Sequence, residues 1–275
     1  MFGLIEKWDT ISWILYNIFS SIKFWCWDCF RFRKMLRRNK ELKNKHKGGR
    51  CFIVLNGPSI SNYDLTELEN EIVICANFFY LSKYFDVVKP DYCCISDSDA
   101  FHGGLLERVH EMMKKYPDMK YILNKKAYKV LDAGEREKSY FVYGMHMPHL
   151  YRIKGDLTKN SSSFINVSAF CILCAVYMGF DKIYILGNDF APGPMPHCFE
   201  EPEEFKYGKE VYRKKSRKEL CAFHWYYYLA QVQSFYIEQY ARNKNVCVYN
   251  LNPDSYIRAY DFEKYENIFK KTEQK

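Results

Sequence analysis

Residues 51–59 read Cys-Phe-Ile-Val-Leu-Asn-Gly-Pro-Ser, and this stretch decides the fold of the chain. Five β-prone apolar residues stop abruptly on a polar turn, which predicts a buried first strand of an α/β sheet. The turn places Asn56, Gly57 and Ser59 at the carboxyl end of that strand, where the ligands of such sheets bind. Gly57 lets a ligand approach the backbone closely, although the turn is neither a Walker loop nor a Gly-x-Gly-x-x-Gly sequence. An ordinary strand-to-loop turn is the alternative interpretation.

Short apolar runs alternate with helical stretches after this first strand. That alternation predicts the fold class α/β, a mostly parallel sheet with helices on both faces. No repeat or low-complexity linker divides residues 51–275, so we expect a single domain there. The predicted strands are CFIVL (51–55), EIVICA (71–76), DYCCIS (91–96), KYIL (120–123), YFVYG (140–144), KIYIL (182–186) and VCVYN (246–250). The predicted helices begin near Asp64, Phe79, Gly104, Lys126, Ser163, Lys209 and Asp261.

The first thirty residues show a different pattern, in which apolar side chains recur at steps of four and three. This spacing predicts an N-terminal amphipathic helix. Lys7, Asp9, Lys23 and Asp28 interrupt it too often for a membrane span, and a signal-peptide cleavage site is not apparent. The apolar stripe comprises Leu4, Trp8, Ile11, Leu15, Ile18, Ile22, Trp25 and Cys29.

Positive charge is concentrated in one segment. The chain has a formal net charge of +8, yet residues 31–50 alone hold ten Lys or Arg against Glu41. Such a distribution indicates a local anionic partner and argues against a nucleic-acid-binding globule. Following a Trp-rich helix, it predicts that residues 1–50 lie as an anchor on an anionic membrane surface. A helix that forms oligomers, or one that packs on the domain, is the alternative.

The eleven cysteines have no regular spacing. We therefore expect reduced, buried thiols and a cytoplasmic compartment rather than a disulfide framework. Cys26 and Cys29 form one Cys-x-x-Cys, but a zinc site needs a second pair. The thiols expected inside strands or helices are Cys75, Cys93, Cys94, Cys171, Cys174 and Cys247.

Polar residues follow four of the predicted strands at the point where each ends. Because parallel strands bring their carboxyl ends to one edge of a sheet, we expect these residues to meet at one crevice. Each residue alone is explained by a turn or a helix cap, and the site is inferred from their coincidence. They are Asn56 and Ser59 after the first strand, Asn77 after the second, Ser96 and Asp97 after the third, and Asn188 and Asp189 after the sixth.

Two further stretches carry candidate ligand-binding groups. Asp97-Ser98-Asp99 matches the Asp-x-Asp pattern that holds a divalent cation and a nucleotide-sugar diphosphate, so Mg²⁺ at Asp97 and Asp99 is one alternative. Capping of the next helix by Asp99 is the other. Asn166 and Ser168 open a long apolar helix, whose N-terminus favours a phosphate or a carboxylate. An ordinary capped core helix explains these two residues as well.

A loop rich in Pro and Gly runs from Gly187 to His197. A compact domain tolerates such a loop mainly at the rim of an active site. His197 and His224 are the histidines that follow residue 150, and an imidazole is suited to take a proton near neutral pH. Either is therefore a candidate general base, and a surface or core histidine is the alternative for each.

Four segments resemble, in this order, the bacterial lipooligosaccharide sialyltransferases and the related domain family named after hydroxymethylpterin pyrophosphokinase. They are VLNGPS, CANFFY, NVSAFCILCAVYMGFDKIYILGNDF and VYNLNPDS, within residues 51–256. The likeness is firmest at NGPS and at GFDKIYILGNDF. It implies a Rossmann-like sheet and, for the sialyltransferases, a CMP-activated sialic acid used without a metal.

The resemblance also implies roles for individual residues by matching position. His197 stands where the sialyltransferases have a phosphate-binding tyrosine, and a histidine in this loop resembles the pterin-kinase-like branch. For the catalytic histidine of the sialyltransferases, counting back from VYNLNPDS without a gap reaches Tyr228, one helical turn beyond His224. The other implied contacts are Asn56, Gly57 and Ser59 to the cytidine nucleotide and its phosphate, Asn77 to the nucleotide or donor sugar, Ser96 or Asp97 to the nucleobase, Asn166 to Ser168 to the sugar or its carboxylate, and Asp189, after Gly187, to the ribose.

Taken together, these features predict a membrane-associated, inverting, metal-independent glycosyltransferase that requires no cofactor. Its expected donor is a nucleotide-sugar, a CMP-linked acidic sugar such as sialic acid, and its expected acceptor is a cell-surface glycan or a lipid-linked acceptor. We expect a peripheral protein on the cytoplasmic face of a bacterial inner membrane, with homo-oligomer formation left open. Two alternatives are an ATP-dependent pyrophosphokinase-like enzyme, which the lack of a Gly-Lys-Ser/Thr loop disfavours, and a non-catalytic membrane scaffold.

Overall fold

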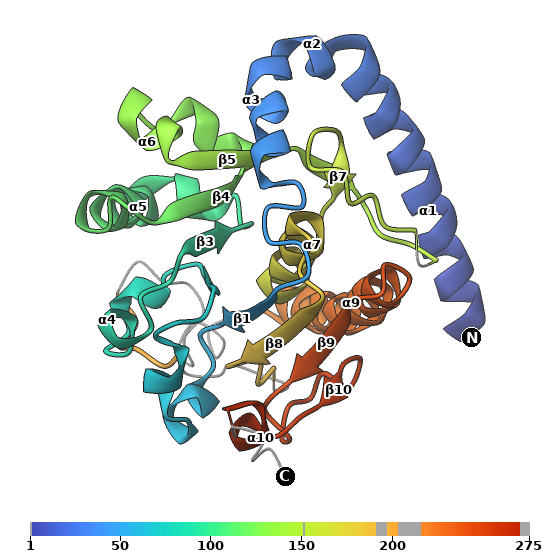
Figure 1. Cartoon of the computed structure of the whole chain (residues 1–275). Helices are drawn as coiled ribbons and strands as arrows, with labels where there is room; N and C mark the ends of the chain where they lie inside the picture. Colours follow the sequence, from blue (N-terminus) through green and yellow to red (C-terminus); the bar gives the residue numbers. More distant parts are fainter. Residues whose placement is uncertain (1, 151, 191–196, 203–215, 270–275) are drawn as a thin grey trace.

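The computed structural model of the chain describes residues 2–150, 152–190, 197–202 and 216–269, with side chains from Thr10 onward. Its centre is a parallel sheet with helices around it, as the sequence predicts (Figure 1). The main sheet has the order β10 (Asp261–Phe262), β9 (Cys247–Asn250), β8 (Lys182–Leu186), β1 (Arg50–Val54), β2 (Val73–Ala76), β3 (Tyr92–Ile95), β4 (Lys120–Asn124) and β5 (Ser139–Val142), and all neighbours in it pair in parallel.

Helices cover both faces of this sheet, and β1 shows why. Its side chains alternate between the faces, so that Phe52 and Val54 enter one apolar cluster while Cys51 and Ile53 enter the other. The α-helices of the described residues are α1 (Phe2–Lys23), α2 (Cys29–Arg31), α3 (Arg33–Arg38), α4 (Phe85–Val88), α5 (Gly103–Lys115), α6 (Ala133–Glu137), α7 (Val167–Met178), α9 (Arg217–Arg242) and α10 (Tyr265–Phe269). The first cluster contains α4, α5 and α10 side chains, and the second contains those of α7 and α9.

All seven predicted strands are present, because each is an apolar run that enters the sheet. Three very short strands were not predicted: β10, and the pair β6 (Gly144–His146) and β7 (Ser161–Ser162). The helices expected near Asp64 and Lys126 are single 3₁₀ turns, Leu65–Leu68 and Lys125–Lys129. The helix expected near Asp261 begins later, at Tyr265. Lys209, where another helix was expected, lies outside the described residues.

The cysteines are all unpaired, as predicted. Cys75, Cys93, Cys94, Cys171 and Cys174 are buried in strands or in α7. Cys247 was expected to be buried as well, and that prediction was wrong. It is exposed because it opens β9, whose neighbour β10 is only two residues long and leaves the first residue of β9 uncovered.

Helix α7 supports the strands whose carboxyl ends carry the predicted polar residues. Its twelve residues are apolar on nearly every side, and it packs against β1, β2 and β3. Asn166 caps its N-terminus, since Asn166 Oδ1 accepts a hydrogen bond from the Ala169 N–H at 2.8 Å. Gly179 ends it in the left-handed conformation, with φ of 88°. The sequence thus fixes both ends of the helix that supports the strand termini.

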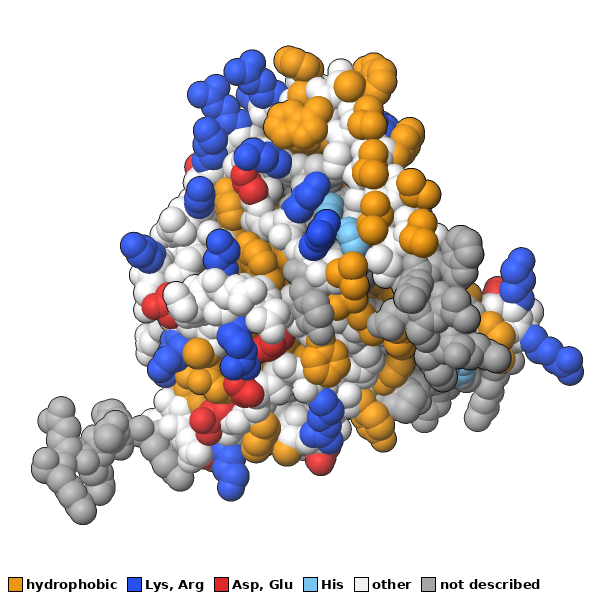
Figure 2. Space-filling model, turned by 90° about the vertical axis from the view of Figure 1, so that its right-hand side faces the viewer, with side chains coloured by type: hydrophobic (Ala, Val, Ile, Leu, Met, Phe, Trp, Pro, Cys, Tyr) orange, Lys and Arg blue, Asp and Glu red, His pale blue; other side chains and the backbone are white. Residues whose placement is uncertain are grey.

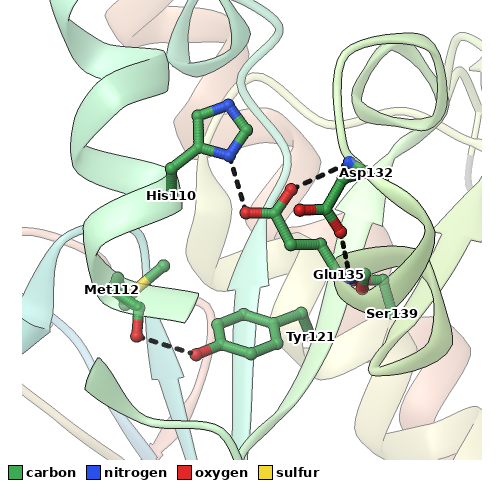
Figure 3. Close-up of polar contacts among 6 residues, drawn as sticks. All are labelled: His110, Met112, Tyr121, Asp132, Glu135 and Ser139. Atoms are coloured by element: carbon green, nitrogen blue, oxygen red, sulfur yellow. Dashed lines mark hydrogen bonds and ion pairs between the residues drawn. The ribbon is translucent and has the colours of Figure 1, made fainter. Parts of the chain in front are cut away.

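Helix α6 is held against α5 by a polar network (Figure 3). Asp132 and Glu135 form a capping box, in which the Glu135 N–H donates to Asp132 Oδ1 at 2.8 Å and the Asp132 N–H donates to Glu135 Oε2 at 3.0 Å. His110 Nδ1 on α5 lies 2.6 Å from Glu135 Oε1. The Ser139 hydroxyl donates to the Glu135 carbonyl oxygen at 2.7 Å, which ties α6 to the start of β5. This fixes α6 as one wall of a groove described below.

Candidate active site

A cavity of about 830 Å³ opens at the carboxyl ends of β1 to β4. Its wall collects the residues that follow these strands, together with the start of the segment before α7, the loop at His197 and one side of α9. Of the residues predicted from the sequence, Asn56, Asn77, Ser96, Asp97 and His197 line it. Its other polar and aromatic lining residues are Phe78, Ser98, Asp99, Asn124, Ser163, Phe164, Glu219, Phe223 and Tyr226.

Two amide oxygens in this cavity wall have no hydrogen-bond partner among the residues that the structure describes. The side-chain oxygens of Asn56 and Asn77 are buried, and neither accepts a hydrogen bond from any described residue. Asn77 has φ of 52°, in the left-handed region that Asn tolerates better than most residues. Its backbone N–H donates to the Cys94 carbonyl oxygen at 2.9 Å, which fixes the turn after β2. An unpartnered buried acceptor costs about 1–3 kcal/mol, so both oxygens are suited to a ligand that brings N–H or O–H donors.

The turn after β1 is packed tightly against the turn after β8. The Gly57 N–H donates to the Gly187 carbonyl oxygen at 3.0 Å, and the Ser59 N–H donates to Asp189 Oδ2 at 2.9 Å. A side chain on Gly57 would collide with both Asp189 and Gly187, which explains the glycine. The buried Asp189 carboxylate also accepts a hydrogen bond from Asn252 Nδ2 at 2.6 Å. The two turns thus bring together four predicted residues, Gly57, Ser59, Gly187 and Asp189. They lie behind the cavity wall and support it, but none of them is a lining residue.

His197 is the histidine that the structure places in the cavity. Its Nδ1 lies 2.7 Å from Glu201 Oε1, and its ring stacks on Phe199 with the planes 2° apart. The Cys198 N–H donates to the Asn56 carbonyl oxygen at 2.8 Å, so this loop is attached to the end of β1. A carboxylate on Nδ1 fixes the orientation and tautomer of the ring.

His224 lies elsewhere. Its side chain is exposed on α9 and does not line the cavity, whereas Phe223 and Tyr226 of the same helix do. Asn166 and Ser168 also lie outside the lining: Asn166 caps α7, and the Ser168 hydroxyl donates to Asn166 Oδ1 at 3.1 Å. The structure therefore does not bring these three predicted residues to the cavity surface. Of the loop predicted as the rim, residues 191–196 lie outside the described residues.

Acidic groups dominate the charge of the described lining. Asp97, Asp99 and Glu219 line the cavity, and no Lys or Arg does so among the residues that the structure describes. Two of these carboxylates have local structural partners: Asp97 Oδ1 accepts from the Asp99 N–H at 2.9 Å, and Glu219 Oε2 accepts from the Ser216 N–H at 2.7 Å. Within the described ranges, no three His, Cys, Asp or Glu side chains form a metal-binding cluster.

Asn124 and Glu201 belong to the site but were not predicted. Asn124 Nδ2 donates to the Ser96 carbonyl oxygen at 3.0 Å, and its Oδ1 accepts from the Lys126 N–H at 3.0 Å, so it closes the cavity beside β4. It follows a strand, as Asn56 and Asn77 do, and the same rule applied to KYILN would have identified it. Glu201 lies among several glutamates, and nothing in the sequence distinguishes it from them.

Comparison with known proteins gives one family and several solved structures. A family model described as "6-hydroxymethylpterin diphosphokinase MptE-like" matches residues 31–193. No curated protein matches the sequence.

Among solved structures, sialyltransferase CstII from Campylobacter jejuni in complex with cytidine-5'-monophosphate is similar to this chain. The identity is 13% and the TM-score is 0.47, over 78% of this chain and 85% of that chain. The monofunctional α-2,3-sialyltransferase Cst-I from Campylobacter jejuni is similar with 15% identity and a TM-score of 0.34, over 78% and 79%. The family model is that of the second family named from the sequence.

Proposed function

This chain belongs to the 6-hydroxymethylpterin diphosphokinase MptE-like family, and on that premise we propose that it is a transferase that binds a nucleotide-activated substrate in the cavity at the strand ends. The reaction we propose is glycosyl transfer from a nucleotide-sugar to a hydroxyl group of a cell-surface glycan or a lipid-linked acceptor. One observation carries the proposal: unpartnered amide oxygens and a histidine held by a carboxylate meet in a single cavity.

The amide oxygens favour a ligand rich in hydroxyl or amino groups. Asn56 Oδ1 and Asn77 Oδ1 can only accept hydrogen bonds, and both lack a donor within the described part of the chain. Ribose and hexose hydroxyls supply such donors, and so does the amino group of cytosine. Phosphate oxygens do not, because they are acceptors themselves. The part of the cavity beside Asn56 and Asn77 therefore suits the sugar or nucleoside portion of a donor better than its phosphates.

His197 is the proposed general base. The Nδ1–H of the ring donates a hydrogen bond to Glu201 Oε1. In the proposed step, Nε2 takes the proton from the acceptor hydroxyl. The acceptor oxygen then forms a bond to the anomeric carbon while the bond from that carbon to the nucleotide phosphate breaks. The proton ends on His197, and the electron pair leaves with the phosphate. A single displacement inverts the anomeric carbon, and this step needs no metal or cofactor.

A second part of the proposal concerns which nucleotide-sugar is the donor. The resemblance to the sialyltransferases favours a CMP-linked acidic sugar, and a nucleoside monophosphate leaving group brings less charge than a diphosphate. The described lining has three carboxylates, which repel a sugar carboxylate unless other groups neutralise it. Neutral sugar nucleotides therefore belong in the same test as the CMP-linked acidic ones.

The family description favours a second candidate, an ATP-dependent diphosphokinase. Such a reaction uses Mg²⁺ to neutralise the phosphates, and Mg²⁺ is commonly held by one or two carboxylates together with substrate phosphates. Asp97 and Asp99 on the cavity wall are a suitable pair of that kind. In this case the two aspartates would hold the ion, and His197 would accept the proton from the pterin-like hydroxyl.

Isothermal titration of the full chain separates these functions. The panel comprises CMP, a CMP-linked sialic acid, UDP, GDP and ATP, each with Mg²⁺ and with a chelator. A glycosyltransferase of the proposed kind binds the cytidine ligands with and without the chelator, whereas the diphosphokinase binds ATP and only with Mg²⁺. A non-catalytic scaffold binds none of them, and that result would reject both enzymes.

A further inference from the structure

Helix α1 contacts the rest of the domain through its polar side. The Asn17 side chain pairs with the backbone of Met147: Asn17 Nδ2 donates to the Met147 carbonyl oxygen at 2.9 Å, and Asn17 Oδ1 accepts from the Met147 N–H at 2.8 Å. Asn160 Nδ2 donates to the Ser20 hydroxyl at 3.4 Å, and Lys154 Nζ to the Ser21 hydroxyl at 3.3 Å. Asn17 and Ser20 are buried by these contacts. The side of α1 that water would ordinarily cover is therefore the side that faces the protein.

The C-terminal end of α1 repeats this orientation. A π-helical turn, Phe24–Asp28, follows α1 and buries Phe24 and Asp28 on the same side. Asp28 accepts hydrogen bonds from the Tyr143 hydroxyl and, at 2.8 Å, from Lys23 Nζ. Burial alone raises the pKa of the Asp28 carboxyl, but the Lys23 and Tyr143 hydrogen bonds outweigh it and hold that pKa below its usual value. A charged, hydrogen-bonded aspartate thus fixes this end of the helix on β5 and β6.

The apolar side of the helix consequently points outward. From Ile11 to Ile22 its exposed side chains recur three or four residues apart, and the thirteen residues from Thr10 to Ile22 include no charged one. Figure 2 faces this side and shows hydrophobic side chains running in a column, with Lys and Arg side chains gathered beside its upper end. Leu15 and Phe19 are 62% and 66% exposed, far more than a globular core helix leaves uncovered. We define the apolar column as Ile11, Ile14, Leu15, Ile18, Phe19, Ile22, Trp25, Trp27 and Phe30.

A basic groove of about 1090 Å³ adjoins the upper end of this column. It lies between α3 and α6, and Arg38 joins the two helices by donating from Nη1 to the Arg136 carbonyl oxygen at 2.8 Å. The Arg136 Nε is buried and has no hydrogen-bond partner among the described residues. The groove is lined by the cations Arg31, Arg33, Lys34, Arg37, Arg38, Lys40 and Arg136, against the carboxylates of Glu41 and Glu137.

The column and the groove form one continuous surface. Phe30 belongs to both, since it is 73% exposed and also lines the groove. Trp25 and Trp27 lie at this junction, and tryptophan favours the boundary between lipid and water. A second copy of the chain, docked face to face, would bring two such basic grooves close together. An anionic bilayer instead supplies an apolar phase for the column and opposite charge for the groove.

We propose that the apolar column and the basic groove together form a docking surface for an anionic phospholipid bilayer. The column enters the boundary of the acyl chains, and the groove holds lipid phosphates. No helix of the described residues is long and apolar enough to cross a membrane. Trp13 of α1 stacks on Trp225 of α9 at 6.3 Å, and the neighbouring Tyr226 lines the cavity, so the docked bilayer lies close to the cavity mouth. This inference does not depend on which nucleotide the cavity binds.

Sedimentation of the full chain with vesicles tests the proposal. We expect binding to vesicles of phosphatidylcholine with one third phosphatidylglycerol, weaker binding to pure phosphatidylcholine, and further weakening at high salt. Leu15→Glu with Phe19→Glu should reduce binding to anionic vesicles by about tenfold or more, because both side chains would leave the lipid. Arg33→Glu with Arg37→Glu should reduce it by about 20-fold or more. Four of the five tryptophans lie in residues 8–27, so vesicle binding should also shift tryptophan emission to shorter wavelength.

Matched controls replace exposed residues away from this surface. Tyr256→Glu with Phe262→Glu controls for the loss of exposed apolar area, and Lys89→Glu with Lys244→Glu controls for charge reversal. Both controls should bind vesicles as the wild type does. The proposal is overturned if the wild type does not bind anionic vesicles, or if the column and groove variants bind as well as their controls. It is also overturned if light scattering shows a dimer that Leu15→Glu with Phe19→Glu dissociates while vesicle binding persists.

Discussion

The substitution Gly57→Ala tests how the cavity wall is built. Gly57 has φ of −69° and ψ of 150°, a conformation open to alanine, so the backbone itself imposes no penalty. A methyl group at this position would lie closer than 3.0 Å to the Asp189 carboxylate and to the Gly187 carbonyl oxygen. Neither group is the loose end of a flexible side chain. The carboxylate is held by Ser59 and Asn252, and the Gly187 carbonyl accepts the Gly57 N–H.

The expected cost follows from what must move. Relieving the clash displaces one of the two turns and weakens at least one hydrogen bond, so we expect a loss of about 2–3 kcal/mol in the free energy of unfolding. For a chain of this size that corresponds to a fall of about 5–10 °C in Tm. Asn56 moves with Gly57, so affinity for the nucleotide bound by the wild type should fall by about tenfold or more.

Gly134→Ala is the matched control. Gly134 lies in α6, and the nearest atom to an added methyl group is Asp132 Oδ1 at 3.5 Å. We expect this change to stabilise the chain by about 0.5–1 kcal/mol, because alanine favours a helix. The assay is thermal unfolding of both variants, followed by isothermal titration. If Gly57→Ala unfolds at or above the wild-type Tm and binds nucleotide unchanged, the close packing of the two turns is not what shapes the cavity.

Three further predictions concern catalysis and pH. His197→Ala should lower kcat/KM by about 10²–10⁴-fold with little change in nucleotide Kd. Glu201→Gln should lower kcat/KM by about tenfold, and His224→Ala should leave it unchanged. Equal losses of kcat/KM for the His197 and His224 variants in a transfer assay would contradict the assignment of the base. Asp99→Asn and an excess of chelator should each leave glycosyl transfer within about threefold of wild type, and abolition by the chelator would instead support the magnesium-dependent diphosphokinase. Burial, with Lys154 and His149 nearby, lowers the pKa of His146 to about 4. Between pH of about 6.5 and about 4 the unfolded chain therefore binds a proton that the folded chain does not, so acidification should lower the free energy of unfolding by about 2 kcal/mol after allowance for solvent screening. His146→Gln should flatten that dependence in urea titrations, and an unchanged slope would show that another group is responsible.

The sheet could be predicted because each of its main strands carries its own signal. Runs such as KIYIL are short, β-branched and buried, and a polar turn follows each of them. The strands β6, β7 and β10 are two or three residues long and contain no period to detect. These strands form because the segments beside them are already in place. A local sequence pattern carries no information about that tertiary context.

The site could be predicted only in part, for a similar reason. Asn56, Asn77, Ser96 and Asp97 converge because parallel strands share one edge, and that rule needs no further information. The same rule cannot separate a residue that lines the cavity from one that braces it. Asp189 follows β8 as Asn77 follows β2, yet it is turned inward to Ser59 and Asn252.

The sequence left the orientation of α1 open between a helix on a membrane surface and one that forms oligomers or packs on the domain. Its spacing establishes an apolar stripe, but a stripe normally packs inward. The outward orientation depends on hydrogen bonds that join Asn17 to Met147 and Asp28 to Tyr143, with each pair more than a hundred residues apart in the sequence.

The position of bound cytidine monophosphate, determined in crystals of the full chain at saturating nucleotide, is the most direct test of the central claim. We expect the nucleotide in the cavity at the ends of β1 to β4, with one of its hydroxyl or amino groups donating to Asn56 Oδ1 or Asn77 Oδ1 and with His197 lining the same cavity. A nucleotide bound at another surface, or a cavity that stays without ligand under these conditions, would contradict it.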